Sequence, residues 1–490
     1  MKKLSTLIDV PVRDGFDPVI NGLTQDSRKV REGYLFAAVP GHKDDGHRFI
    51  TDAVRHGAVA VVALPGTALL PEVAERVVLV PHENPRRALA QIAARFYDSQ
   101  PRVLAAVTGT NGKTSTVHFA QQIWRAMGLK AACLGTLGVV GSGKAQTGSL
   151  TTPDSVALHA TLADLAASGI THLAMEASSH GLHQSRLDGV KASVAGFTSF
   201  SHDHLDYHGN MDDYLIAKAH LFSDILQHGG TAVLNADIPE YRDLTSRLEG
   251  RACRIISYGE KGSDIRLLHQ KPTPSGQQVT IAVAGQEMTL SLPLVGRFQV
   301  MNALCALGLV IAEFANDPQK VVATVPYLEK LTGVPGRLQW VEGHPCGAVY
   351  VDYAHTPDAL ERVIEALRPH TAGKLVCLIG CGGNRDAAKR PVMGRIAAVE
   401  ADLAIITDDN PRDEDPALIR RAMMQGAAEG NAIEIGDRRM AITQAVTMLE
   451  EGDVLVIAGK GHEQGQIIGE RVEPFDDAAE ARRAIAELRG

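Results

Sequence analysis

One stretch of the sequence, V-T-G-T-N-G-K-T-S-T at residues 107–116, limits the folds open to this chain more than any other. It follows an apolar run at residues 103–107 and precedes a helix-like stretch at residues 117–127. Apolar runs of this length are typical of buried strands, and glycine-rich segments mark sharp turns. The stretch therefore predicts a strand, a glycine turn and a helix start, which together are a building block of α/β sheets.

The same stretch carries the residue types of a phosphate-binding loop. A helix N-terminus presents unpaired backbone N–H groups and the positive end of a dipole, and glycines let those groups approach a triphosphate closely. Gly109 and Gly112 would form the turn, Lys113 would meet the outer phosphates, and Thr114 offers a hydroxyl to a magnesium ion. The match to the general P-loop pattern is incomplete, because Val107 stands where that pattern has its first glycine. A purely structural turn is the alternative.

Composition excludes several classes of protein. With 490 residues the chain is long enough for about two to four domains. Its net charge of -8 offers no basic surface, so we expect no nucleic-acid partner. The six cysteines lack paired metal-ligand spacing and fit a reducing compartment. Nowhere do about eighteen apolar residues follow one another, and the N-terminus has only a broken apolar run, so we expect a cytoplasmic protein without a membrane span.

Changes of pattern divide the chain into three units: residues 1–98, 99–334 and 335–490. In the first unit, short apolar runs alternate with helical patterns, as in a small α/β domain. It also contains L-T-Q-D-S-R at residues 23–28, which by spacing alone reads as a polar loop. The second unit starts with the phosphate loop and ends at G-V-P-G-R, residues 333–337, because glycine and proline interrupt helices and strands.

Two polar motifs follow predicted strands of the second unit. Glu176, in M-E-A-S-S-H-G-L, ends a predicted strand at residues 172–175, where ligands of open α/β sheets collect. Residues 201–209, S-H-D-H-L-D-Y-H-G, follow an apolar run and include three histidines and two aspartates. One carboxylate and one imidazole near the phosphates would be enough for a hard cation, which keeps several of its waters. The alternative is a polar surface turn that is rich in histidine.

Lys218 lies in a predicted helical stretch at residues 212–227 whose apolar positions surround it. A lysine on such a face usually extends its amine to water, and from the residues alone that is the expected role. Farther along, alternation at residues 279–294 predicts strands and an apolar pattern at residues 303–314 predicts a helix.

Four polar loops follow the predicted strands of the third unit. The strands are expected at residues 347–353, 375–379, 403–407 and 454–458. The loops after them read D-Y-A-H-T-P-D, G-C-G-G-N-R-D, T-D-D-N-P-R and A-G-K-G-H-E. Because loops that follow parallel strands meet at one edge of the sheet, they predict a ligand crevice there. For one of them the alternative is that Asn410-Pro411 is only a turn and Arg412 a surface charge.

Taken together, T-G-T-N-G-K-T, M-E-A-S-S-H-G-L, D-H-L-D-Y-H-G, D-Y-A-H-T-P-D and D-D-N-P-R resemble motifs of the ATP-dependent Mur ligases of bacterial cell-wall synthesis. The resemblance covers nearly the whole chain, in order. T-G-T-N-G-K-T is shared with folylpolyglutamate synthases, whereas D-N-P-R with L-T-Q-D-S-R is more specific. The resemblance implies an α/β fold with the three-domain Mur ligase architecture: an N-terminal domain for a UDP-sugar, a central P-loop ATPase domain and a C-terminal Rossmann-like domain for the incoming amino acid.

The resemblance also implies site residues. The catalytic positions would be Lys113, Glu176, His204 and Lys218, and Mg²⁺ would be held by Thr114, Glu176, His204 and Lys218 as a carbamate. ATP would contact Gly109, Thr110, Asn111, Gly112, Lys113, Thr114, Ser115, Asn302, Arg337, Asp352 and His355. The UDP-substrate would contact Gln25, Ser27, His42, Lys43, Asp44, Thr151, Thr152, Ser178, Gln184 and Arg186. The amino acid, diaminopimelate, would contact Arg385, Asp409, Asn410, Pro411, Arg412, Gly459 and Glu463.

The implied reaction adds meso-2,6-diaminopimelate to the D-glutamate of a UDP-N-acetylmuramoyl dipeptide through an acyl phosphate, at the expense of ATP. Arg412 favours this amino acid on physical grounds, because a guanidinium grips the second carboxylate of diaminopimelate through two parallel hydrogen bonds. The partners would be small molecules only, and we expect a monomer.

Two other functions are alternatives to this one. A folylpolyglutamate synthase shares the ATPase core, but the N-terminal unit and the D-N-P-R loop weigh against it. A catalytically silent nucleotide-binding scaffold would not need intact Lys113, Glu176, His204 and Lys218.

Overall fold

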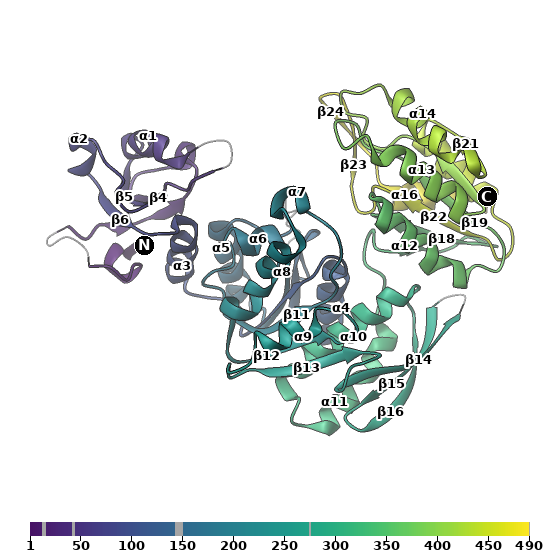
Figure 1. Ribbon diagram of the computed structural model, residues 1–490, viewed down its shortest axis with the longest axis horizontal. Coiled ribbons are helices and arrows are strands. Elements are labelled where there is room, and N and C mark those ends of the chain that lie inside the picture. The colour runs from purple at the N-terminus through teal and green to yellow at the C-terminus, as the bar shows by residue number, and fades with distance from the viewer. Residues whose placement is uncertain (12–15, 42–44, 143–149, 274–275, 490) are drawn as a thin grey trace. The chain divides into compact units, whose positions relative to one another are not determined.

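The computed structural model describes residues 1–490 except 12–15, 42–44, 143–149, 274–275 and 490 (Figure 1). The predicted substrate contacts His42, Lys43 and Asp44 therefore lie outside the described residues. The chain forms two compact units. The first holds residues 1–266 and 304–321, and the second holds residues 267–303 and 322–490.

The N-terminal part of the first unit is a parallel sheet in the order β3-β4-β5-β6, preceded by a short antiparallel pair, β1 (Lys2–Lys3) with β2 (Val19–Ile20). Its elements are β3 (Gly22–Thr24), β4 (Tyr34–Ala37), β5 (Ala58–Ala63), β6 (Val78–Pro81), α1 (Ile50–Arg55), α2 (Pro71–Ala74) and α3 (Pro85–Tyr97). The helix α3 begins at Pro85 because the Asn84 side chain caps its first amides and Pro85 takes the first helical position.

The larger sheet of the first unit follows the order β13-β12-β11-β7-β10-β8-β9. Its strands are β7 (Val103–Thr108), β8 (Ala131–Gly135), β9 (Gly138–Val140), β10 (His172–Glu176), β11 (Ala192–Phe197), β12 (Leu226–Asn235) and β13 (Arg254–Gly259). All pair in parallel except β9, which returns antiparallel on β8. Its helices include α4 (Lys113–Ala126), α5 (Ser155–Ala167), α6 (Ser179–His183), α7 (Leu205–His208), α8 (Met211–His220) and α9 (Tyr241–Ser246).

The strand β7 lies in the middle of this sheet, between β11 and β10. All its residues are buried, as the apolar run predicts for a central parallel strand. On one face, Leu158 and Leu162 of α5 share a core with Leu104 and Leu173. The loop after β7 and Glu176 at the end of β10 thus emerge at the same carboxyl edge of the sheet.

The prediction of a helix over residues 212–227 is wrong at its C-terminal end. The helix α8 stops at His220, a single π-helical turn covers Leu221–Ile225, and β12 begins at Leu226. Leu221, Phe222 and Ile225 are buried in the core. Because buried apolar residues occur both within helices and after them, the sequence pattern does not show where the helix ends. The pairing of Leu226 with Ala192 of β11, a contact distant in sequence, determines where the strand begins.

The second unit contains a doubly wound sheet in the order β17-β18-β22-β19-β20-β21, parallel except for β17. The strands are β17 (Gln339–Val341), β18 (Ala348–Asp352), β19 (Leu375–Ile379), β20 (Leu403–Ile406), β21 (Ala432–Glu434) and β22 (Val454–Ala458). The helices are α12 (Pro357–Leu367), α13 (Lys389–Glu400), α14 (Pro416–Gly426), α15 (Arg438–Thr447) and α16 (Asp477–Glu487). The predicted strands at residues 375–379 and 454–458 are confirmed to the residue.

Alternate side chains of this sheet pack on opposite faces. Leu375 and Cys377 of β19 face a core with α12, α13 and α14, while Val376 and Leu378 face a core with α15 and α16. Because both faces are covered, the strands read as continuous apolar runs. A hairpin, β23 (Gly465–Ile468) with β24 (Arg471–Pro474), follows β22.

The remaining elements of the second unit are β14 (Ile265–Thr273), β15 (Gly276–Val283), β16 (Gln286–Leu292), α10 (Arg297–Ile311) and α11 (Pro318–Thr324), the first, fourth and fifth of which cross its boundary. The helix α10 starts six residues before the predicted 303–314. Among the described residues, the stretch Arg297–Phe314 is the one helical segment long and apolar enough to suggest a membrane span, with a mean hydropathy of 1.4. Since 67% of it is buried inside the protein, it reads as a core helix.

Candidate active site

The predicted phosphate loop has the geometry of a strand, a glycine turn and a helix. The strand β7 ends at Thr108 and α4 begins at Lys113, with Gly112 in a left-handed conformation as its N-cap. Gly109 has φ +142°, and a Cβ there would lie 2.0 Å from Oγ1 of Thr198. Only glycine fits this turn, and the first amides of α4 face the carboxyl edge of the sheet, where an anion would bind.

Two lysine amines converge on this loop. Nζ of Lys113 donates to the carbonyl oxygens of Gly109 at 2.9 Å and Thr110 at 2.8 Å. Nζ of Lys218, from α8, donates to the same Gly109 oxygen at 2.8 Å and lies 4.3 Å from the centre of the Tyr214 ring. Lys218 is 1% exposed. It is therefore buried at the loop, and the expectation from the residues alone that its amine reaches water is wrong.

The electrostatic surroundings of Lys218 disfavour its charged form. Burial, followed by the positive charge of Lys113, lowers the pKa of the Lys218 amine well below its usual value. Both effects oppose the charged ammonium form, and the neutral form of an amine is the nucleophilic one.

Glu176 lies buried at the end of β10, beside the start of α4. Its Oε2 accepts from the Thr114 hydroxyl at 3.1 Å, and its Oε1 accepts from the backbone amide of Thr136 at 2.8 Å. A Cβ on Gly135 would lie 2.1 Å from Oε1, so glycine is needed beside the carboxylate. The structure thus brings together a buried carboxylate and a hydroxyl, both oxygen donors of the kind that Mg²⁺ prefers.

His204 is more exposed than Glu176 or Lys218. It takes a left-handed conformation at the start of α7, with 48% of its side chain exposed. Its ring packs against His180 and its Nε2 lies 3.4 Å from Asp203. Among the described residues, no three His, Cys, Asp or Glu side chains are grouped as metal ligands. The Thr114–Glu176 pair fits a hard cation that retains waters, with His204 on the loop that follows β11.

The predicted substrate contacts of the central part form one hydrogen-bonded network. The Thr152 hydroxyl donates to the Glu176 carbonyl at 2.9 Å and lies 3.1 Å from the Ser178 hydroxyl. Arg186 donates to the Thr152 carbonyl at 2.7 Å and to the Gln184 side chain at 2.7 Å. Thr151 joins through a 3.1 Å contact with the hydroxyl of Thr136. By contrast, Gln25 and Ser27 lie after β3, in the N-terminal part of this unit.

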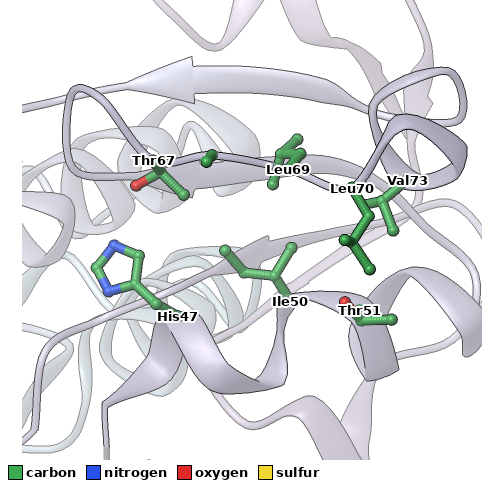
Figure 2. Close-up of a pocket in the computed structure, with 8 residues that line it drawn as sticks. His47, Ile50, Thr51, Thr67, Leu69, Leu70 and Val73 are labelled. Atoms are coloured by element: carbon green, nitrogen blue, oxygen red, sulfur yellow. The ribbon is translucent and has the colours of Figure 1, made fainter.

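That N-terminal part contains a cavity of about 240 Å³, shown in Figure 2. It is lined by His47, Ile50, Thr51, Thr67, Ala68, Leu69, Leu70 and Val73. Nδ1 of His47 is held 2.7 Å from Asp45, just after the predicted contacts at 42–44. Among the described residues that line it, the polar groups are the His47 ring and the hydroxyls of Thr51 and Thr67.

In the second unit, two of the predicted ATP contacts lie at the last residue of β18 and in the loop that follows it. Asp352 is buried, and its carboxylate accepts from the amides of Leu338 at 2.7 Å and Ala354 at 2.8 Å. Burial raises its pKa. His355 lies in the same loop, with its Nδ1 2.8 Å from the Tyr353 carbonyl oxygen. The Arg337 guanidinium stacks over the Tyr353 ring, 4.8 Å from its centre.

Asn302 and Arg337 are joined by Gln299, a residue that the sequence reasoning did not assign. Asn302 donates to the Gln299 side chain at 3.0 Å, and that side chain donates to the Arg337 carbonyl at 3.1 Å. Two predicted ATP contacts are therefore held in fixed relation by one buried amide.

The four polar loops of the second unit meet at the carboxyl edge of its sheet, as predicted. Gly459, after β22, donates its amide to the Asp352 carbonyl at 3.1 Å. A Cβ on Gly459 would lie 2.8 Å from a carboxylate oxygen of Asp409, after β20. Asn410 donates to the Glu463 carboxylate at 2.9 Å. These contacts bring together loops that are up to about a hundred residues apart in the sequence.

Arg412 is tied to its surroundings by both backbone and side chain. Its amide donates to the Ile467 carbonyl in β23 at 3.0 Å, and its guanidinium donates to the Gly383 carbonyl at 2.8 Å. It is half-buried and left-handed at φ 52°. Arg385 is exposed in the Gly383 loop. The interpretation of Arg412 as an unconstrained surface charge is therefore wrong, because one of its guanidinium nitrogens is held within the loop cluster.

Comparisons with known proteins show the family of this chain. The family models described as Mur ligase family, catalytic domain; Mur ligase middle domain; and Mur ligase, glutamate ligase domain match residues 19–97, 107–310 and 336–461. The chain is 51% identical over 491 residues to the UDP-N-acetylmuramoyl-L-alanyl-D-glutamate--2,6-diaminopimelate ligase of Caulobacter vibrioides, with 99% of each chain covered. This chain belongs to the Mur ligase family.

Solved structures support the family fold. This Mur ligase is similar to a structure of a UDP-N-acetylmuramoyl-L-alanyl-D-glutamate--2,6-diaminopimelate ligase, with a TM-score of 0.73, 32% identity and coverage of 100% of this chain and 99% of that one. A Mycobacterium tuberculosis folylpolyglutamate synthase complexed with ADP gives a TM-score of 0.59 at 19% identity, covering 76% and 91%. At that identity the second likeness shows a shared fold alone.

The sequence assigned no role to three residues of this Mur ligase site. Thr136 binds Glu176, Gln299 joins Asn302 to Arg337, and Lys460 binds Asn410 and Glu463. Lys460 lies within the A-G-K-G-H-E loop, so its position among site residues was a signal. For Thr136, the only signal in the sequence is the glycine that precedes it, Gly135.

Proposed function

We propose that this Mur ligase is the ATP-dependent ligase that adds meso-2,6-diaminopimelate to the D-glutamate of UDP-N-acetylmuramoyl-L-alanyl-D-glutamate. The observation that best supports this function is the position of Arg412, whose guanidinium is hydrogen-bonded to the Gly383 carbonyl where the loops meet. The chain is also 51% identical to a relative named for this reaction. The product would enter peptidoglycan synthesis, and with it cell-wall biogenesis, cell shape and division.

In the first chemical step, the γ-carboxylate of the D-glutamate attacks the γ-phosphorus of ATP and ADP leaves, which gives an acyl phosphate. Lys113 and the first amides of α4 neutralise the charge that develops on the phosphoryl oxygens. In the second step the amine of diaminopimelate attacks the acyl carbon, loses a proton, and inorganic phosphate leaves as the amide forms. No nucleophile from the protein is needed.

Thr114, Glu176 and His204 would hold Mg²⁺, and Lys218 would join them as a carbamate. When bound, the metal would neutralise the phosphate oxygens and orient them for transfer. The Thr114–Glu176 contact of 3.1 Å supports this, because it places two oxygen donors beside the phosphate loop.

The surroundings of Lys218 support carbamylation. Its lowered pKa favours the neutral amine, which adds to carbon dioxide with loss of one proton to give the carbamate anion. The anion is a metal ligand, whereas an ammonium would repel a cation. The carbamate N–H could keep its hydrogen bond to Gly109.

For the amino acid, we propose that Arg412 and Arg385 bind carboxylates while Glu463 and Asp409 receive the distal ammonium. Asn410, Pro411 and Gly459 would shape the loop around it. The held guanidinium of Arg412 has other N–H groups for the distal carboxylate of diaminopimelate, which lysine lacks.

Each of the three sequence units would bind a different part of the substrates. Residues 1–98 would take the UDP moiety through Gln25, Ser27 and the 42–44 segment, with Thr151, Thr152, Ser178, Gln184 and Arg186 holding the rest of that substrate. Residues 99–334 would bind ATP, with Gly109 to Ser115 and Asn302 as contacts. Residues 335–490 would bind the amino acid and contribute Arg337, Asp352 and His355 to ATP. We propose a monomer that acts in the cytoplasm, where nucleotide substrates are made available.

The test is phosphate release from ATP with UDP-N-acetylmuramoyl-L-alanyl-D-glutamate present, comparing meso-diaminopimelate, L-lysine and no amino acid. Release that depends on diaminopimelate is expected. Release with lysine alone would keep the ligase and contradict the role of Arg412. Release only with a folate and glutamate would favour the folylpolyglutamate synthase, and no turnover with any of these would favour the silent scaffold.

A further inference from the structure

Lys460 is a buried cation to which the proposed reaction assigns no role. It follows β22 and is 0% exposed. Its Nζ donates to Oδ1 of Asn410 at 3.0 Å and to Oε2 of Glu463 at 3.4 Å. A buried ammonium is costly unless it is paired, so the position of this lysine requires its two partners.

Lys460, Asn410 and Glu463 form a closed triangle. Besides the two contacts of Lys460, Nδ2 of Asn410 donates to the same Oε2 of Glu463 at 2.9 Å. Oδ1 of Asn410 also accepts from the Ile467 amide at 3.0 Å, which fixes the orientation of the amide group. One oxygen of Glu463 is thus committed to the protein. The Glu463 side chain is 36% exposed, so its other oxygen can meet a ligand.

The loops around this triangle carry charges of both signs, among them the exposed carboxylates of Asp386 and Asp413. Arg385, Arg412 and Lys460 are cationic, whereas Asp409 and Glu463 are the carboxylates proposed for the ligand. Other charged groups nearby are paired among themselves: Arg420 with Asp408 and Glu434, Arg390 with Glu414, and Arg438 with Asp477. Lys389, which donates to the His355 carbonyl at 2.7 Å, adds one more cation at this edge.

We infer that Lys460 is a specificity-determining residue, which disfavours an amino acid whose far end is a bare ammonium and so favours one that carries a carboxylate there as well. This rests on the proposed function. The Lys460 ammonium half-neutralises Glu463, so the carboxylate attracts a lone cation weakly. A distal carboxylate compensates by meeting the guanidinium groups of Arg385 and Arg412, and the discrimination therefore comes from repulsion by Lys460 as well as from attraction to Arg412.

A purely structural role makes a different prediction. If Lys460 only stabilised the loops, its loss would weaken the binding of every amino acid by the same factor. If its charge discriminates, its loss would improve the binding of L-lysine relative to that of diaminopimelate, because the repulsion disappears while Glu463 keeps its bond from Asn410.

The experiment compares wild type, Lys460→Met and Lys460→Arg by phosphate release. It measures the KM for meso-diaminopimelate, the inhibition constant of L-lysine against it, and the KM for ATP. We expect the ratio of the lysine constant to the diaminopimelate KM to fall about tenfold in Lys460→Met and to stay within about twofold in Lys460→Arg, which keeps the charge. The KM for ATP should not change. Lys374→Met, an exposed lysine of the same unit, is the matched control.

An unchanged ratio in an active Lys460→Met variant would overturn the inference. Should that variant fail to fold, Lys460→Gln gives the same comparison, because it retains a hydrogen-bond donor but no charge. Absence of diaminopimelate-dependent release from wild type would contradict the proposed function itself, and the two failures are thereby distinguished.

Discussion

The amines of Lys113 and Lys218 donate to one and the same oxygen, the carbonyl of Gly109, at 2.9 and 2.8 Å. They cannot be farther apart than the sum of these distances, in a place where Lys218 is shielded from water. Two ammonium ions at such a separation repel each other. The arrangement therefore favours a neutral or anionic state of Lys218, the more buried of the two.

Lys218→Ala should abolish most of the activity, because the proposed carbamate is lost with the amine. Added magnesium alone should not restore it, whereas a short-chain carboxylate such as propionate should restore part of it by occupying the vacated space. The measurement is phosphate release across a series of carboxylate concentrations. Full activity of Lys218→Ala without any additive would contradict the carbamate.

Lys113→Ala is the matched control for that rescue. It removes an amine from the same carbonyl oxygen, yet its proposed role is that of a cation facing phosphate. Carboxylates should therefore leave this variant inactive, since an anion cannot replace a positive charge. Equal rescue of both variants would show that the carboxylate acts elsewhere.

Gly135→Ala should impair metal use although it replaces none of the proposed ligands. The new Cβ would lie 2.1 Å from Oε1 of Glu176, so the carboxylate would have to move away from Thr114. We expect activity to fall at least about tenfold, as for a misplaced catalytic group, and to recover partly at high magnesium. A titration of activity against magnesium concentration measures this. An unaltered magnesium dependence would contradict the assignment of Glu176.

Arg412→Lys should weaken the use of diaminopimelate far more than that of ATP. A lysine keeps the charge but cannot make two parallel hydrogen bonds to a carboxylate, and one charge-assisted bond is worth about 1.5–3 kcal/mol, or about 10- to 100-fold in KM. Steady-state kinetics with each substrate varied in turn measure the effect. Arg421→Lys, at an exposed position of the same unit, is the control. Equal KM values for diaminopimelate in both variants would contradict the role of Arg412.

The protein should lose stability as the pH falls from about 6.5 toward 4, partly through His159. Burial lowers the pKa of this histidine to about 4 in the folded state. Between that value and the ordinary 6.5, the unfolded chain binds the extra proton, so acid favours unfolding by up to roughly 3 kcal/mol at this site. Stability from this site is complete above pH 6.5.

Melting temperatures between pH 7 and pH 4, for wild type and His159→Gln, test this expectation. The variant should be less stable at pH 7 but should lose less on acidification. Parallel melting curves for the two proteins across this range would contradict it. His208 and His462, whose pKa values burial also lowers to about 4, should account for part of the remaining slope.

Much of the fold could be predicted because its signals are local. The start of α3 follows from Asn84 and Pro85, and the turn before α4 follows from Gly109 and Gly112. The parallel strands β19 and β22 follow from short apolar runs, and the meeting of four polar loops follows from the direction of those strands. Each of these rests on a few neighbouring residues, and backbone conformation and strand direction depend mainly on such neighbours.

Only the tertiary structure decided where individual amines and carboxylates lie. The apolar neighbours of Lys218 are the same for a lysine that reaches water and for one buried against Gly109, 109 residues earlier. Lys460 and Thr136 likewise gain their partners from other loops. The start of β12 was set by pairing with β11. Sequence determined the elements and the edges where chemistry collects, whereas burial and charge pairing depend on contacts summed over distant segments, which no local pattern contains.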